Sequence, residues 1–161
     1  MLVGGLAIER GAGAGARSPD AEARPRARAM RILCVEDNPT NRRVLAALMT
    51  PLGPEMHMVD NGLDAVDAWE QGAFDLVFMD IQMPVLDGVE ATIEIRERER
   101  RQGRPWTPII AVTANVDPEQ MRGYFAAGID AVVAKPVAPT VLYEAVATTL
   151  RSRSRVGAAA A

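Results

Sequence analysis

The sequence contains a single cysteine, Cys34, so no disulfide can form within the chain. Cys34 lies inside an apolar run, which predicts a small buried side chain and not a reactive thiol. A chain without disulfides fits a reducing compartment, and we expect a cytoplasmic location. No apolar run approaches the roughly 18 residues of a membrane span, and the N-terminal residues lack the basic start of a signal peptide. We therefore expect no membrane contact by this chain.

Excess charge of one sign is also scarce. The formal net charge is −3 over 161 residues, of which 24% are charged and 48% are hydrophobic. These proportions are typical of a soluble globular protein and argue against nucleic acid as a partner. We expect one domain at residues 30–150, with disordered tails at 1–29 and 151–161. The first tail is either a linker or the product of a misassigned start codon ahead of Met30.

What the chain does have is a set of short apolar runs, each followed directly by a polar site. They are 32–35 with Glu36 and Asp37, 76–79 with Asp80, 109–112 with Thr113, and 132–134 with Lys135. Such runs predict strands of a parallel sheet covered on both faces, whose carboxyl ends meet at one crevice. Carboxylates, a hydroxyl and an ammonium around one crevice suit a divalent cation and a phosphoryl group. The sequence therefore predicts a phosphorylation site.

Strand and helix patterns alternate five times between the tails. The predicted strands are about 31–36, 55–59, 75–79, 109–112 and 131–134, and the predicted helices are about 39–49, 63–70, 88–101, 118–127 and 139–150. Alternation with short connections predicts an α/β fold, a doubly wound five-stranded parallel sheet with right-handed crossovers. We expect the strand order 2-1-3-4-5, which is also that of flavodoxin.

The polar sites belong to five sequence blocks: Val35 to Arg42 (VEDNPTNR), Met79 to Pro84 (MDIQMP), Asp87-Gly88, Thr113-Ala114-Asn115 and Lys135-Pro136. In these blocks the chain resembles the receiver domains of two-component response regulators. The blocks occur in the family's order and at its separations, over about residues 30–150. The first block and the Thr-Ala-Asn triplet are most similar to receivers attached to hybrid sensor histidine kinases.

The resemblance implies a role for each polar site. Asp80 would be the phosphoacceptor, Lys135 and Thr113 would contact the phosphoryl oxygens, and Mg²⁺ would be the cofactor. The implied Mg²⁺ ligands are Asp37, Asp80, the backbone carbonyl of Gln82, and Glu36 through a water. Gln82 and Asn115 would flank the aspartyl phosphate and set its lifetime, and Pro136 would match the family's cis-proline. The donor would be a histidine kinase or a histidine phosphotransfer protein.

Several other interpretations compete with this one. Glu36 and Asp37 also fit a simple helix N-cap, and Thr113 an ordinary strand end. A phosphatase of the haloacid-dehalogenase type also uses an Asp nucleophile, but its second Asp is replaced here by Gln82. A pseudo-receiver would lack the acidic set, and an FMN binder would need a hydroxyl-rich phosphate loop. We interpret the only histidine, His57, as a bystander on an edge strand. The signalling interpretation predicts no turnover of an external metabolite.

One departure from the family concerns the switch. The family usually carries Tyr or Phe two residues before the lysine, where this chain has Val133. We expect phosphorylation to act through Thr113 and to reorder the helix at 118–127, which carries Gly123 in its interior, on the face it shares with the last strand. Asn41, Arg42 and Pro136 are the candidate donor contacts. We expect a monomer or weak dimer that is a stand-alone regulator or part of a hybrid kinase, with an unknown downstream target.

Overall fold

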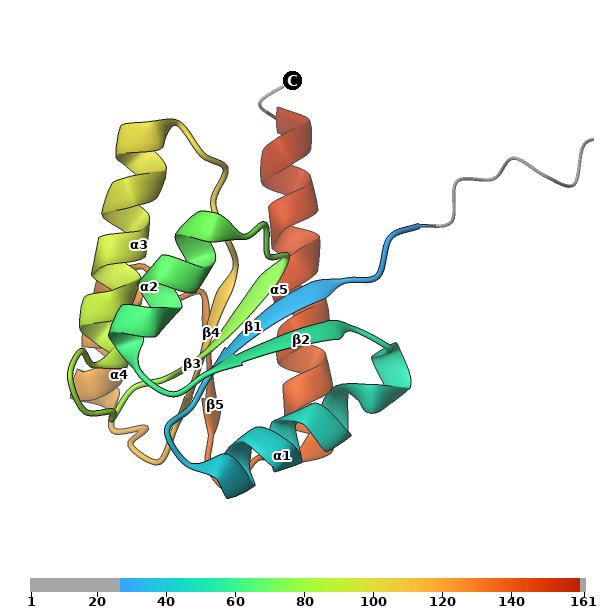
Figure 1. The fold of residues 1–161 in the computed structure, drawn as a ribbon, viewed down its shortest axis with the longest axis vertical. Helices are drawn as coiled ribbons and strands as arrows, with labels where there is room; N and C mark the ends of the chain where they lie inside the picture. The colour runs from blue at the N-terminus through green and yellow to red at the C-terminus, as the bar shows by residue number, and fades with distance from the viewer. Residues whose placement is uncertain (1–26, 160–161) are drawn as a thin grey trace, which may run out of the picture.

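The computed structural model describes residues 27–159, with side chains described as far as residue 155 (Figure 1). One sheet of five parallel strands has the order β2-β1-β3-β4-β5, which confirms the predicted fold class and strand order. The strands are β1 (Arg31–Val35), β2 (Glu55–Val59), β3 (Leu76–Asp80), β4 (Ile109–Thr113) and β5 (Ala131–Ala134). Most of the tail expected at 1–29 lies outside the described residues.

A helix follows each strand. The helices are α1 (Pro39–Met49), with the short 3-10 helix η2 (Thr50–Leu52) after it, then α2 (Gly62–Gln71), α3 (Gly88–Gln102), α4 (Pro118–Ala127) and α5 (Pro139–Ala159). Local chemistry fixes their starts: the Asn38 side chain accepts from two backbone N–H groups of α1, and Asp87 and Glu90 form a capping box at α3. Among the described helices, none combines the length and apolar composition needed to cross a membrane.

The helices cover both faces of the sheet, and the sheet separates the core into two layers. Alternate residues of β1 serve the two layers, because successive strand side chains point to opposite faces. Leu33 and Val35 pack with Trp69 of α2 and Ile95 of α3. Ile32 and Cys34 pack with residues of α1 and α5, among them Leu45, Met49, Leu142 and Val146. This burial holds the strand ends in fixed positions, so the polar residues beyond them form a rigid site.

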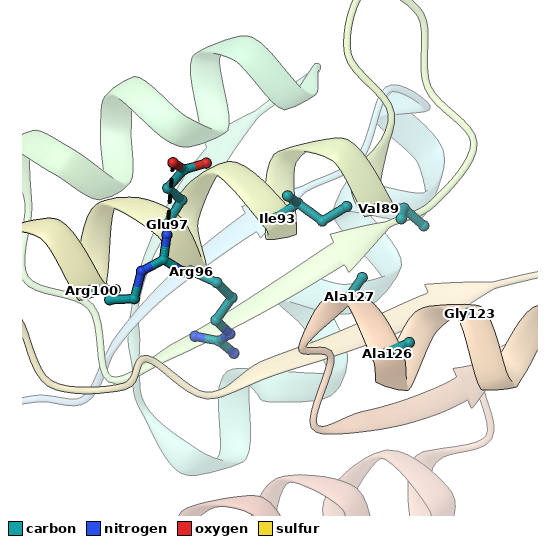
Figure 2. Close-up of a pocket in the computed structure, with 8 residues that line it drawn as sticks. All are labelled: Val89, Ile93, Arg96, Glu97, Arg100, Gly123, Ala126 and Ala127. Atoms are coloured by element: carbon teal, nitrogen blue, oxygen red, sulfur yellow. Dashed lines mark ion pairs between the residues drawn. The ribbon is translucent and has the colours of Figure 1, made fainter.

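A hollow of about 400 Å³ lies between α3 and α4 (Figure 2). It is lined by Val89, Ile93, Arg96, Glu97, Arg100, Gly123, Ala126 and Ala127. The hollow exists because α4 presents only Gly and Ala there, and a Cβ at Gly123 would meet no atom within 4 Å. Toward α3, α4 therefore packs only through small residues, whereas Tyr124 and Met121 hold it to the core.

The structure differs from the expected disordered tail at 151–161, because α5 continues to Ala159. Asp75, just before β3, anchors the last turns of this helix. The guanidinium of Arg153 donates to the Asp75 carbonyl at 3.4 Å, and Arg28 pairs with the Asp75 carboxylate at 2.8 Å. One aspartate thus ties both flanking segments to the sheet. Within α4, Tyr124 is buried, whereas Phe125 is 48% exposed and does not belong to the core.

Candidate functional site

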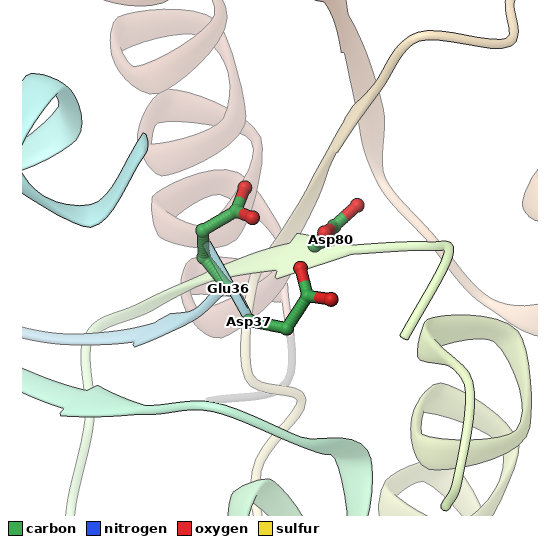
Figure 3. Close-up of side chains that lie close together, drawn as sticks. All are labelled: Glu36, Asp37 and Asp80. Atoms are coloured by element: carbon green, nitrogen blue, oxygen red, sulfur yellow. The ribbon is translucent and has the colours of Figure 1, made fainter. Parts of the chain in front are cut away.

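The carboxyl ends of β1 and β3 bring three acidic residues together (Figure 3). Glu36 and Asp37 follow β1, and Asp80 is the last residue of β3. One carboxylate oxygen from each lies within 4.8 Å of the others. Glu36 and Asp80 are 1% and 4% exposed, whereas Asp37 is exposed at the mouth of the site. The predicted convergence of these residues at one crevice is therefore present in the structure.

Lys135 reaches this cluster from the far side of β4. Its Nζ lies 2.8 Å from Oε2 of Glu36 and 3.3 Å from Oδ1 of Asp80. The peptide bond between Lys135 and Pro136 is cis, as the resemblance implied. The ammonium thus lies between the two buried carboxylates. There it can neutralise negative charge on a group that becomes attached to Asp80.

The three buried charges perturb one another. Burial, followed by the charge of Glu36, raises the pKa of Asp80 from 3.8 to about 6. Burial acts to raise the pKa of Glu36 too, but hydrogen bonds from Lys135 and the Asn38 N–H hold it below its usual value. Burial would lower the pKa of Lys135, yet its bonds to Glu36 and the charge of Asp80 keep it above its usual value. Glu36 and Lys135 form the stable ion pair, and Asp80 carries the uncompensated charge.

The donor set fits a divalent cation. Three carboxylates face one ammonium, and a divalent cation would balance their charge. Within the described part of the chain, no side chain donates to the carboxylate of Asp37, so its oxygens are available as ligands. Hard carboxylate oxygens without sulfur or imidazole ligands suit Mg²⁺ or Ca²⁺ better than a transition metal.

Thr113 closes the site from β4. It is 1% exposed, and its Oγ1 accepts a hydrogen bond from the Asn115 N–H at 3.1 Å. The Asn115 carbonyl in turn accepts a hydrogen bond from the Tyr124 hydroxyl of α4 at 3.3 Å. Nothing in the sequence around Tyr124 indicates this partner, which lies nine residues away. The structure thus links the predicted sensing hydroxyl to α4 through two hydrogen bonds.

Gln82 lies two residues beyond Asp80, exposed in the loop between β3 and α3. It lines a pocket of about 510 Å³ together with Asn115 and Tyr124. Gly88 holds this loop against the end of β3, because a Cβ there would lie 2.1 Å from the Asp80 carbonyl oxygen. Only glycine allows this close approach, which explains the Asp87-Gly88 block.

The candidate donor contacts at α1, Asn41 and Arg42, are less exposed than Pro136. Arg42 is half-buried, and its Nη1 donates to the carbonyl of Glu36 at 2.6 Å and to that of Asp37 at 3.3 Å. Its guanidinium is therefore engaged inside the loop that carries the acids. Asn41 is half-buried, whereas Pro136 is exposed as expected. His57 is exposed on the edge strand β2, the position expected of a bystander.

Comparison with known proteins gives one consistent family. The family model described as "Response regulator receiver domain" matches residues 32–147. The sensor protein GacS of Pseudomonas syringae is 40% identical over 119 residues, and the match covers 74% of this chain but only 13% of GacS. This chain therefore spans a small part of that curated relative.

Solved structures agree with the sequence match. The receiver domain of the sensor histidine kinase PA1611 from Pseudomonas aeruginosa PAO1 has a TM-score of 0.68 and 37% identity, covering 76% of this chain and 98% of that one. That crystal structure has a magnesium ion coordinated in the active site cleft. A co-crystal structure of the Saccharomyces cerevisiae histidine phosphotransfer protein Ypd1 with the receiver domain of Ssk1 matches at 32% identity and TM-score 0.64, covering 71% of this chain and 84% of that one.

Proposed function

This chain belongs to the response regulator receiver domain family, and we propose that its Asp80 accepts a phosphoryl group from a phosphohistidine. The observation that carries the proposal is the position of Asp80, buried between Lys135 and two further carboxylates at the carboxyl edge of the sheet. The donor is a histidine kinase or a histidine phosphotransfer protein, and the Ypd1 complex of a similar receiver supports this class of partner. The reaction takes place in the cytoplasm, where the buried thiol of Cys34 stays unpaired.

The transfer exchanges one bond for another. An Oδ atom of Asp80 forms a bond to phosphorus while the bond between phosphorus and the donor imidazole nitrogen breaks, and that nitrogen keeps the electron pair. Asp80 must be ionised to attack, and a pKa of about 6 leaves it mostly ionised at neutral pH. Lys135, which lies 3.3 Å from Asp80, stabilises negative charge on the phosphoryl oxygens. The receiver thus assists its own phosphorylation and turns over no external metabolite.

The residues present fit Mg²⁺ as the cofactor. Asp37 and Asp80 would bind it directly, with the Gln82 carbonyl as a third protein ligand and Glu36 acting through a water. The magnesium ion of the PA1611 receiver supports this choice of metal. When bound, the ion offsets the repulsion between the carboxylates and an incoming phosphoryl anion. Gln82 and Asn115, which line the adjacent pocket, flank the aspartyl phosphate and influence its lifetime.

The response passes through Thr113 to α4. Val133 is fully buried in β5 and carries no ring that could exchange between two positions. A Thr113 hydroxyl that turns toward a phosphoryl oxygen gives up its bond from the Asn115 N–H, and this loop also holds Tyr124. Because α4 presents only small residues to α3, a modest change in this loop is enough to shift it. The α4–β5 face is therefore the proposed output surface.

The phosphoacceptor assignment is tested by mass spectrometry after incubation with acetyl phosphate or a phosphorylated histidine kinase. We expect wild type to gain one phosphoryl group only with Mg²⁺, and Asp80→Asn to gain none. Asp60→Asn, which removes an exposed carboxylate just after β2, is the matched control and is expected to label normally. Undiminished labelling of Asp80→Asn would show that another residue is the acceptor. Hydrolysis of small phosphomonoesters by wild type would favour the phosphatase interpretation instead.

A further inference from the structure

We propose that Arg42 is a positioning residue that presents Asp37 to the divalent cation. The inference rests on the proposed function of the acidic cluster and adds a residue outside the ligand set. The Arg42 Nη1 donates to the carbonyl of Glu36 at 2.6 Å and to the carbonyl of Asp37 at 3.3 Å. A single guanidinium from the first turns of α1 therefore holds the backbone of both acidic residues of the loop after β1.

Asp37 depends on this contact more than its neighbours do. The Glu36 N–H donates to the Val59 carbonyl at 3.1 Å, and the Asn38 N–H donates to the Glu36 carboxylate at 3.1 Å. Asn38 is held further as the N-cap of α1. Among the described residues, by contrast, Arg42 alone holds the carbonyl of Asp37. Arg42 thus orients the peptide carbonyl of Asp37, the residue whose carboxylate is exposed at the mouth of the site.

The sign of the effect separates positioning from simple electrostatics. A cation near a metal site repels the metal, so removal of a positive charge by itself tightens Mg²⁺ binding. Loss of a group that orients a ligand weakens binding, because the ligand must be ordered when the metal arrives. The two roles therefore predict changes in opposite directions. Arg43 provides the matched control, since it is the next residue of α1, carries the same charge and is exposed.

The experiment compares Mg²⁺ titrations of wild type, Arg42→Met, Arg42→Lys and Arg43→Met by isothermal titration calorimetry, without phosphoryl donor. We expect the Mg²⁺ Kd of Arg42→Met to rise roughly 10-fold, the magnitude typical of residues that orient metal ligands. Arg42→Lys keeps the charge but loses the planar two-carbonyl geometry, and its Kd should still rise. Arg43→Met should bind Mg²⁺ as wild type does or slightly more tightly. Arg42→Gln replaces Arg42→Met if the latter does not fold.

A second measurement needs no metal. In the metal-free proteins, we expect the backbone NMR order parameter of Asp37 to be about 0.85 in wild type and in Arg43→Met. In Arg42→Met it should fall toward about 0.6. Labelling by acetyl phosphate should be slow in Arg42→Met at limiting Mg²⁺ and close to wild type at saturating Mg²⁺. An unchanged or tighter Kd in Arg42→Met would overturn the positioning role. Failure of wild type itself to bind Mg²⁺ would instead overturn the proposed function.

Discussion

Replacement of Asp80 by asparagine should make the metal-free protein more stable. Asp80 is 4% exposed, and burial together with the charge of Glu36 raises its pKa from 3.8 to about 6. The folded state therefore holds an ionised carboxylate in a position that disfavours its charge. An asparagine side chain in this position has the same shape without that charge, so the substitution removes the penalty and keeps the packing.

The magnitude follows from proton linkage. A folded-state pKa about two units above the unfolded value corresponds to about 3 kcal/mol at neutral pH, as an upper figure. Because the asparagine amide must still be accommodated beside Lys135, we expect a gain of about 1 to 3 kcal/mol in the free energy of unfolding. The sign is fixed by the direction of the shift. The folded state binds the proton more tightly, so wild type loses stability as pH rises from about 4 to about 6 and stays lower above that.

The assay is urea unfolding of wild type and Asp80→Asn in EDTA at several pH values between 4 and 8. The difference should be largest above pH 6 and shrink toward pH 4, where Asp80 is protonated in the folded state and partly protonated in the unfolded state. Added Mg²⁺ should stabilise wild type by about 2.7 kcal/mol at 100 times its Kd and leave Asp80→Asn almost unchanged. Equal stability of the two proteins at pH 8, or a difference independent of pH, would refute the reasoning. Asp60→Asn serves as the exposed control.

Two further predictions concern the loop after Asp80 and the helix α4. Gly88→Ala places a Cβ 2.1 Å from the Asp80 carbonyl oxygen and should cost at least about 2 kcal/mol in urea unfolding, whereas Gly123→Ala, with no atom within 4 Å, should stabilise by up to about 1 kcal/mol. Equal effects would contradict the close approach at Gly88. Tyr124→Phe removes the hydrogen bond to the Asn115 carbonyl, and beryllofluoride should then change hydrogen exchange in α4 less than it does in wild type. An identical change in both proteins would exclude this link.

The sequence by itself determined the fold and the edge of the sheet that carries the chemistry. Short apolar runs such as 76–79 encode buried parallel strands locally, and helix starts are encoded by caps such as Asn38. Once the strands are parallel, the residues after them must meet at one edge, so Glu36, Asp37 and Asp80 could be placed together without coordinates. The helix ends were less well predicted. In the extended part of α5, Arg153 contacts Asp75, a residue far away in the sequence, and no local pattern indicates this contact.

The tertiary structure alone decided how the polar groups share their partners. Lys135 pairs more closely with Glu36 than with Asp80, and burial together with the charge of Glu36 raises the pKa of Asp80. Arg42 turns inward to two carbonyls of its own loop, although its sequence position is equally consistent with an exposed docking residue. The physical reason is that periodicity and caps act over a few residues, whereas a pKa or a side-chain hydrogen bond depends on burial and on atoms brought close by strands distant in sequence.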